Sequence, residues 1–182
     1  MLDSREQSGY SRNRRAARIL ALRFVARLIT MPKIDIENLK TDESTAYPAP
    51  FRQAVAGRVR KRLGDVAGLT QFGVNLTSLK PGAASAQRHW HAAEDEFIYV
   101  VAGEVVLCAD SGDTVLRAGD AAGFKAGVAN AHCLVNRSGE DAVYLEIGTR
   151  AVHERAEYPD IDLRMERNDK GARFLHRSGE PW

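Results

Sequence analysis

The chain has 182 residues and a formal net charge of +2, a length that suits one domain. The positive charge is concentrated in residues 1–30, where seven arginines stand against two acids, so the rest of the chain carries a formal charge of −3. A mildly acidic body excludes nucleic acid as the main partner, because phosphate backbones require a cationic surface. Two cysteines, Cys108 and Cys133, are too few for a disulfide framework, and they predict a reducing, cytoplasmic location.

Residues 1–30 differ in composition from the rest of the chain. They include the arginine-rich stretch RNRRAARILALRFVARLI, which is similar in composition to an organellar transit peptide. Arg23 and Arg27 interrupt its apolar residues, which excludes the core of a signal peptide and a membrane span, so no membrane partner is expected. We hypothesise that the functional chain starts at Met31 and that residues 1–30 are a disordered or dispensable extension.

The body of the chain is predicted to consist of short strands separated by turns. Turn sequences such as PG, DSGD and AGD recur roughly every 8–12 residues, a spacing typical of an antiparallel barrel or sandwich. The strand-like runs cover residues 57–65, 69–79, 96–102, 104–109, 114–118, 132–136 and 142–148. We therefore assign a β-barrel to residues 57–150. The proline-containing segments 31–56 and 151–182 are predicted to be N-terminal and C-terminal arms that wrap it.

The run EFIYVV at residues 96–101 is apolar on both faces. Ile98 and Val100 alternate with Phe97, Tyr99 and Val101, whereas a surface strand of a small barrel is expected to be polar on one side. The second face is therefore predicted to be covered, either by the terminal arms or by another subunit. A homodimer is the assembly we expect.

Two of the five histidines stand at alternate positions in the stretch RHWHAAEDE. In a strand, alternate side chains point to the same face, so His89 and His91 are close enough to bind one ion. Gln87 has the same parity and is expected to face the same space. The acid must come from the next strand, where Glu96 shares the register of the inward residues and is favoured over Asp95. Glu94 is interpreted as a turn residue whose replacement would have little effect.

A further ligand is expected from one of the remaining histidines. His132 opens a strand-like segment that can pair with the sheet, whereas His153 follows the last clear strand and His176 is in the C-terminal tail. His132 is therefore the natural candidate. Three imidazoles and one carboxylate suit a divalent transition metal such as Fe, Mn, Ni, Cu or Zn.

These residues resemble the two sequence motifs of the cupin family. The first motif is matched by one acid, two histidines and two glycines, with six residues instead of five before the first histidine: Gly82, His89, His91, Glu96 and Gly103. The second is matched by Gly119, Gly127, His132 and Asn136. It departs from the pattern because Lys125 replaces a proline and because four residues, 128–131, precede His132 where two are usual.

The resemblance covers about residues 70–150 and implies an all-β fold, a double-stranded β-helix or jelly-roll barrel, which the extended terminal arms predicted above would flank. It also implies metal binding by His89, His91, Glu96 and His132. Asn136 is as well suited to satisfying turn backbone as to holding a ligand, and Cys133, which follows His132, should point away from it and contribute packing.

The first functional hypothesis is a metal-dependent enzyme of the oxygenase, isomerase or decarboxylase type, acting on a small carbonyl or carboxylate compound. The second is a non-catalytic binder or sensor of a small ligand, and the third is a structural dimer in which the metal only braces the barrel. A sugar-phosphate isomerase would also need a cationic phosphate site, for which Arg88 and Lys125 are the evident candidates.

Overall fold

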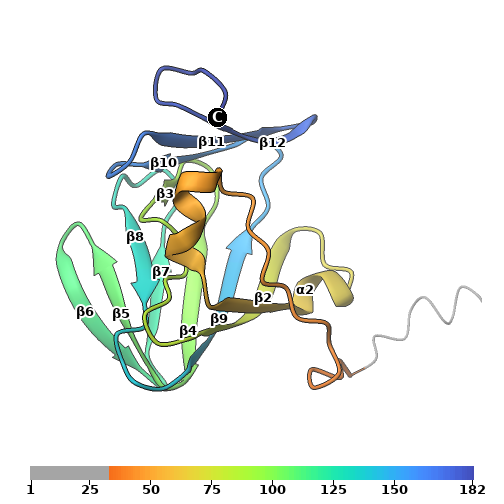
Figure 1. Ribbon diagram of the computed structural model, residues 1–182. Helices are drawn as coiled ribbons and strands as arrows, with labels where there is room; N and C mark the ends of the chain where they lie inside the picture. Colours follow the sequence, from red (N-terminus) through yellow and green to blue (C-terminus); the bar gives the residue numbers. More distant parts are fainter. Residues whose placement is uncertain (1–32) are drawn as a thin grey trace, which may run out of the picture. The chain divides into compact units, whose positions relative to one another are not determined.

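The computed structural model describes residues 33–182, of which residues 35–182 form one compact unit (Figure 1). The hypothesis about residues 1–30 falls outside the described residues, as do the first two residues of the predicted N-terminal arm. Within residues 33–182, no helix is long and apolar enough to cross a membrane.

The strands predicted between residues 57 and 148 are all present. They are β1 (Arg58–Arg62), β2 (Phe72–Leu79), β4 (Glu96–Ala102), β5 (Glu104–Ala109), β6 (Gly112–Arg117), β8 (His132–Val135) and β9 (Ala142–Thr149). The structure adds the short strands β3 (Trp90–His91) and β7 (Ala121–Phe124). A 3-10 helix, η1 (Ala49–Val55), precedes β1, and a short helix, α2 (Leu63–Val66), follows it.

Two antiparallel sheets form the jelly roll predicted from the sequence. One has the strand order β1-β2-β9-β4-β7 and the other the order β6-β5-β8. Both sheets send side chains into one hydrophobic core, which includes Leu79, Val100, Val105, Leu134 and Tyr144. The inward residues alternate along each strand, because successive side chains of a strand point to opposite faces.

The C-terminal segment 151–182 differs from the extended arm that the sequence predicted. It forms the strands β10 (Glu154–Tyr158), β11 (Leu163–Asn168) and β12 (Gly171–Leu175), drawn in blue in Figure 1. These strands and β3 make a four-stranded sheet in the order β12-β11-β10-β3. Their sequences are rich in charged residues, so hydrophobic alternation is weak.

A second hydrophobic cluster explains why this C-terminal sheet is stable. Ala156, Tyr158 and Leu163 are buried there against Tyr47 and Val55, which belong to the N-terminal segment. The two segments predicted as separate arms are therefore packed together. Because β10 pairs with β3, the C-terminal sheet also reaches the stretch that contains His91.

The outer face of β4 is exposed in the described chain. Phe97, Tyr99 and Val101 have relative exposures of 44%, 42% and 46%. Residues 33–56 and 151–182 therefore do not cover this face. Of the two alternatives, the terminal arms or another subunit, the described arms are excluded.

Gly103 marks the sharp turn between β4 and β5. Its φ is +74°, and a Cβ atom placed there would lie 2.7 Å from the carbonyl oxygen of Asp141. Only glycine avoids both the left-handed strain and this collision. The glycine that ends the first motif is thus required by the chain reversal between two core strands.

Candidate metal centre

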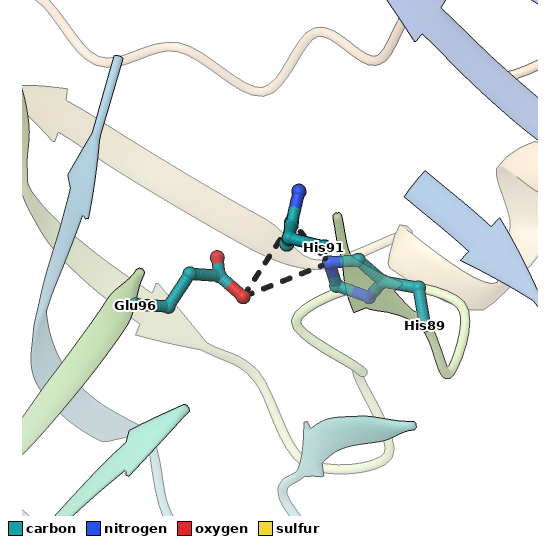
Figure 2. A group of neighbouring side chains, drawn as sticks. All are labelled: His89, His91 and Glu96. Carbon is teal, nitrogen blue, oxygen red and sulfur yellow. Dashed lines mark hydrogen bonds and ion pairs between the residues drawn. The ribbon is translucent and has the colours of Figure 1, made fainter. Parts of the chain in front are cut away.

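Three imidazoles and one carboxylate meet where the three sheets approach one another. The Nε2 atoms of His89 and His91 lie 3.0 Å apart. The Oε2 atom of Glu96 lies 3.0 Å from His132 Nε2, 3.5 Å from His91 Nε2 and 3.9 Å from His89 Nε2. Figure 2 shows the side chains of His89, His91 and Glu96 directed toward one another. The structure thus brings together all four residues that the sequence selected, and we call them the four-donor cluster.

Each of the three sheets supplies one member of this cluster, and His89 lies just before β3. His91 belongs to β3 in the C-terminal sheet, Glu96 opens β4 in the five-stranded sheet, and His132 opens β8 in the three-stranded sheet. His89 is held to His132 by two backbone hydrogen bonds, of 3.1 Å from His89 N and 2.8 Å from His132 N. Residues 128–131, which depart from the family spacing, therefore leave His132 in place.

Each imidazole has an oxygen atom beside its second ring nitrogen, which helps to orient the ring. His89 Nδ1 lies 2.9 Å from the carbonyl oxygen of Gln87, and His132 Nδ1 lies 3.3 Å from that of Asn130. His91 Nδ1 lies 3.4 Å from Oε1 of Glu154. Each of these neighbours is an acceptor, which favours the tautomer with the proton on Nδ1 and a lone pair on Nε2 for a metal.

The four metal-ligating atoms suit a bound cation. Three Nε2 lone pairs and a carboxylate oxygen are directed at one region, and none of these four atoms carries a hydrogen in this tautomeric state. Acceptors held this close repel one another unless a positive charge lies between them. Imidazole nitrogen together with carboxylate oxygen is the ligand mixture that suits divalent transition metals.

Burial and charge keep the cluster in its ligating protonation state. Burial lowers the pKa of His89 to about 4, against the opposing effect of Glu96, so the imidazole is neutral at pH 7. Burial alone would raise the pKa of Glu96, but the proximity of His132 Nε2 and of the other imidazoles lowers it to about 2. A neutral imidazole and an ionised carboxylate are the forms that bind metals. Phe124 stacks on His132 with ring centroids 3.4 Å apart and shields it from water.

Glu154 is a site residue that the sequence reasoning missed. Its side chain is fully buried, and its two carboxylate oxygens accept hydrogen bonds of 2.9 Å each from the backbone N–H groups of Ala92 and Ala93. Oε1 also lies 3.4 Å from His91 Nδ1. Glu154 thus fixes both the backbone after His91 and the ring itself. The sequence signal that could have identified Glu154 is its parity, because it shares one face of β10 with the buried residues Ala156 and Tyr158.

The structure corrects the interpretation of Glu94 as a turn residue whose replacement would have little effect. Its side chain is buried, forms an ion pair with Arg167 and accepts a hydrogen bond of 2.8 Å from Ala151 N. Its carboxylate also lies within 4.8 Å of a ring nitrogen of His91 and of the carboxylate of Glu154. Replacing Glu94 would therefore leave buried polar groups without partners. The sequence could not show this, because Arg167 is far away along the chain.

Asp95 lies apart from the cluster, as the parity argument expected. Its Oδ1 accepts a hydrogen bond of 2.8 Å from Ala126 N. His153 is exposed, and His176 pairs with Asp162 at 2.7 Å. Gln87 differs from expectation: its side-chain amide donates to the carbonyl oxygen of Phe51 at 3.1 Å.

The remaining candidates divide into structural and cavity-lining residues. Asn136 is fully buried, and its amide donates to the carbonyl oxygens of Leu79 and Glu140, which supports the turn-stabilising interpretation. Arg88 is engaged in ion pairs with Asp110 and Asp160. A guanidinium that already has two carboxylate partners is a poor phosphate site.

Two cavities share the residues of the cluster as walls. The first, of about 200 Å³, has Arg58, Arg60 and Glu146 among its lining residues together with His89, Glu96 and His132. We call it the arginine-lined cavity. The second, of about 220 Å³, includes Trp90, Lys125, Asn130, His91, Glu96 and His132. A small molecule in either cavity would contact the four-donor cluster, and Lys125 lies in the second.

Comparisons with known proteins place these observations in a family. The family model for the cupin domain matches residues 75–148. A comparison with curated protein sequences found no match. A protein of Silicibacter pomeroyi, described as a sugar phosphate isomerase from a cupin superfamily, has a similar solved structure. It is 41% identical over 83% of this chain and 96% of that chain, with a TM-score of 0.80.

Two other solved structures are also similar. A protein of Acidithiobacillus ferrooxidans, provisionally described as a sugar phosphate isomerase, is 32% identical over 66% of this chain and 77% of that chain, with a TM-score of 0.63. A polyketide cyclase from Streptomyces resistomycificus is 20% identical over 66% of this chain and 80% of that chain, with a TM-score of 0.55. At this identity, the cyclase shows a likeness of fold alone.

Proposed function

The chain belongs to the cupin superfamily, and on that premise we propose that it is a metal-dependent enzyme acting on a small carbonyl or carboxylate compound. The observation that carries the proposal is the convergence of three Nε2 lone pairs and one carboxylate oxygen beside two cavities. In this proposal His89, His91, Glu96 and His132 hold a divalent transition metal, one of Fe, Mn, Ni, Cu or Zn.

The chemistry follows from what the residues around the cluster can do. A bound divalent ion would act as a Lewis acid toward a carbonyl or carboxylate oxygen of the substrate. Glu154 and the carbonyl oxygen of Gln87 hold the rings of His91 and His89 in orientation. Phe124 covers His132 and limits the access of water to the reacting centre.

Isomerisation of a sugar phosphate is the reaction type that the relatives favour. The Silicibacter and Acidithiobacillus proteins, both above 30% identity, are described in those terms, the second provisionally. Such a substrate presents an oxygen to the metal and carries an anionic group some distance away. The sequence offered Arg88 and Lys125 for that group, but Arg88 is engaged by two aspartates.

We also propose a cytoplasmic homodimer. The exposed β4 residues Phe97 and Tyr99 stand opposite Ile147 and Leu145 of β9, so the apolar face extends across neighbouring strands. A second copy of the chain is the occupant that the pattern favours, since the described arms leave this face open. A reducing location is supported by Cys108 and Cys133, which are free thiols although they are direct cross-strand partners.

The metal assignment is tested by elemental analysis of protein purified from its own host. Replacing His89 or His91 with alanine should remove most of the bound metal and leave a folded barrel, because the hydrophobic core does not depend on the ion. His153→Ala is the matched control, since this histidine is exposed and is not among the grouped ligand residues. Stoichiometric metal in both His89→Ala and His91→Ala would refute the assignment.

Turnover is tested separately. The metal-loaded protein is incubated with a panel of phosphorylated aldoses and ketoses, and products are followed by NMR. If iron is the metal found, oxygen uptake with small carboxylates is measured as well. Metal binding without turnover of any compound in either panel would favour the alternative of a ligand-binding or sensor protein.

A further inference from the structure

Arg58 in the arginine-lined cavity is a buried charge that forms no ion pair with any described residue. Its relative exposure is 7%. Its guanidinium donates to the carbonyl oxygens of Ser85 and Ser44, the latter at 3.5 Å. Among the ion pairs formed within residues 33–182, none includes Arg58. Buried guanidinium groups are normally paired, because neutral carbonyls compensate the charge poorly.

Arg60 adds a second cation to the same wall. It lies two residues further along β1, so its side chain shares the face of Arg58. Its Nη2 donates to the carbonyl oxygen of Ser44 at 3.3 Å. Its Nε is buried and has no hydrogen-bond partner within residues 33–182. A guanidinium carries five N–H groups, so both arginines keep donors for a further acceptor.

The acids of this cavity are already engaged. Glu146 accepts hydrogen bonds from Asn75 at 2.8 Å and from the Tyr144 hydroxyl at 3.4 Å, and forms no ion pair with either arginine. Glu96 belongs to the four-donor cluster. In formal charge the two arginines balance these two glutamates, and a divalent ion in the cluster would add two positive charges. The cavity would then attract an anion.

From these contacts we infer that Arg58 and Arg60 form an anion-binding site for the phosphate or carboxylate group of the substrate. The inference rests on the proposed function, because the anionic group belongs to the same substrate whose reacting oxygen would bind the metal in the cluster. The cavity volume of about 200 Å³ and the shared wall of His89, Glu96 and His132 confine the ligand to a small anionic compound. Two adjacent guanidiniums match the geometry of oxyanions.

The phosphate and carboxylate alternatives are separated by calorimetric titration of the full-length, metal-loaded protein with inorganic phosphate and, in a second arm, with acetate. Saturable binding of either anion is expected, and the tighter of the two identifies the group. Arg60→Gln should weaken that binding at least about tenfold, the range for losing a charged hydrogen bond. Arg58→Gln should have the same effect, and a shift in folding is checked by circular dichroism.

Arg62→Gln is the matched control. Arg62 follows on the same strand but pairs with Asp42 at 2.5 Å and is not among the residues that line this cavity. If Arg58→Gln fails to fold, the contrast between Arg60→Gln and Arg62→Gln decides the matter. Equal affinity in these two variants, or no saturable binding of either anion by the wild-type protein, would overturn the inference.

The same titration on the His91→Ala protein separates this inference from the proposed function. Anion binding that persists, weakened, and still depends on Arg60 supports the site independently of the metal. If the metal-loaded protein and its Arg60→Gln variant bind metal equally and bind the anion with equal affinity, the anion site is overturned and the metal centre is retained.

Discussion

Glu154→Gln is the substitution that best tests how the C-terminal sheet supports the metal centre. The two carboxylate oxygens of Glu154 accept one backbone N–H each, from Ala92 and Ala93, and Oε1 faces His91 Nδ1. A glutamine keeps the shape but has only one oxygen. Its NH₂ group must therefore face the backbone N–H of Ala93, or that of Ala92 together with the ring of His91.

The expected size of the effect follows from this mismatch. A buried N–H that loses its acceptor costs about 1–3 kcal/mol, so the free energy of unfolding of the metal-free protein should fall by about that amount. Loss of the negative charge beside His91 also makes the ring a weaker ligand. Removing such an outer partner lowers metal affinity by about 10–100-fold.

Two measurements distinguish positioning of His91 from simple stabilisation. Urea denaturation of the metal-free protein reports the unfolding free energy, and competition with a chromophoric chelator reports the dissociation constant for Zn²⁺ or Co²⁺. The absorption spectrum of the Co²⁺ form should also change, since it responds to ligand geometry. Glu157→Gln on the same strand is the control, because Glu157 is half-buried and its one ion pair within residues 33–182 is with Arg155, at 3.1 Å.

The reasoning would be refuted by a Glu154→Gln protein that is less stable yet binds Co²⁺ with unchanged affinity and spectrum. That result would make Glu154 a structural anchor of residues 92 and 93 without influence on the ring of His91.

Three further predictions concern the cluster, the sheet face and the thiols. Glu96→Gln should reduce metal content strongly and Asp95→Asn should not, because only Glu96 faces the imidazoles; equal losses by elemental analysis would contradict this. Tyr99→Lys should convert the proposed dimer to a monomer in light scattering, since it places a charge in the exposed apolar face; an unchanged mass, or a monomeric wild type, would exclude this interface. Cys133 should resist alkylation at pH 8 until urea unfolds the protein, because burial raises its pKa to about 12; rapid labelling of the native protein, located by peptide mass spectrometry, would disprove this.

The fold class and the centre of the site could be predicted from local patterns. The alternation of side chains along a strand is a property of the backbone, so a period of two in the sequence reports strands without knowledge of their partners. The same rule placed His89 and His91 on one face and favoured Glu96 over Asp95. It failed for residues 151–182, where charged residues dominate the exposed face and only a few inward positions are apolar.

What the sequence by itself determined is therefore the antiparallel β class and the identity of the four converging side chains. Only the tertiary structure decided which other charges serve the site. Glu154, Arg58 and Arg60 have the pattern of ordinary surface charges on alternating strands. Their roles depend on burial and on the absence of a neutralising partner within the described residues, which arise when strands distant in sequence pair. Electrostatic free energy depends on that three-dimensional environment, and local spacing does not encode it.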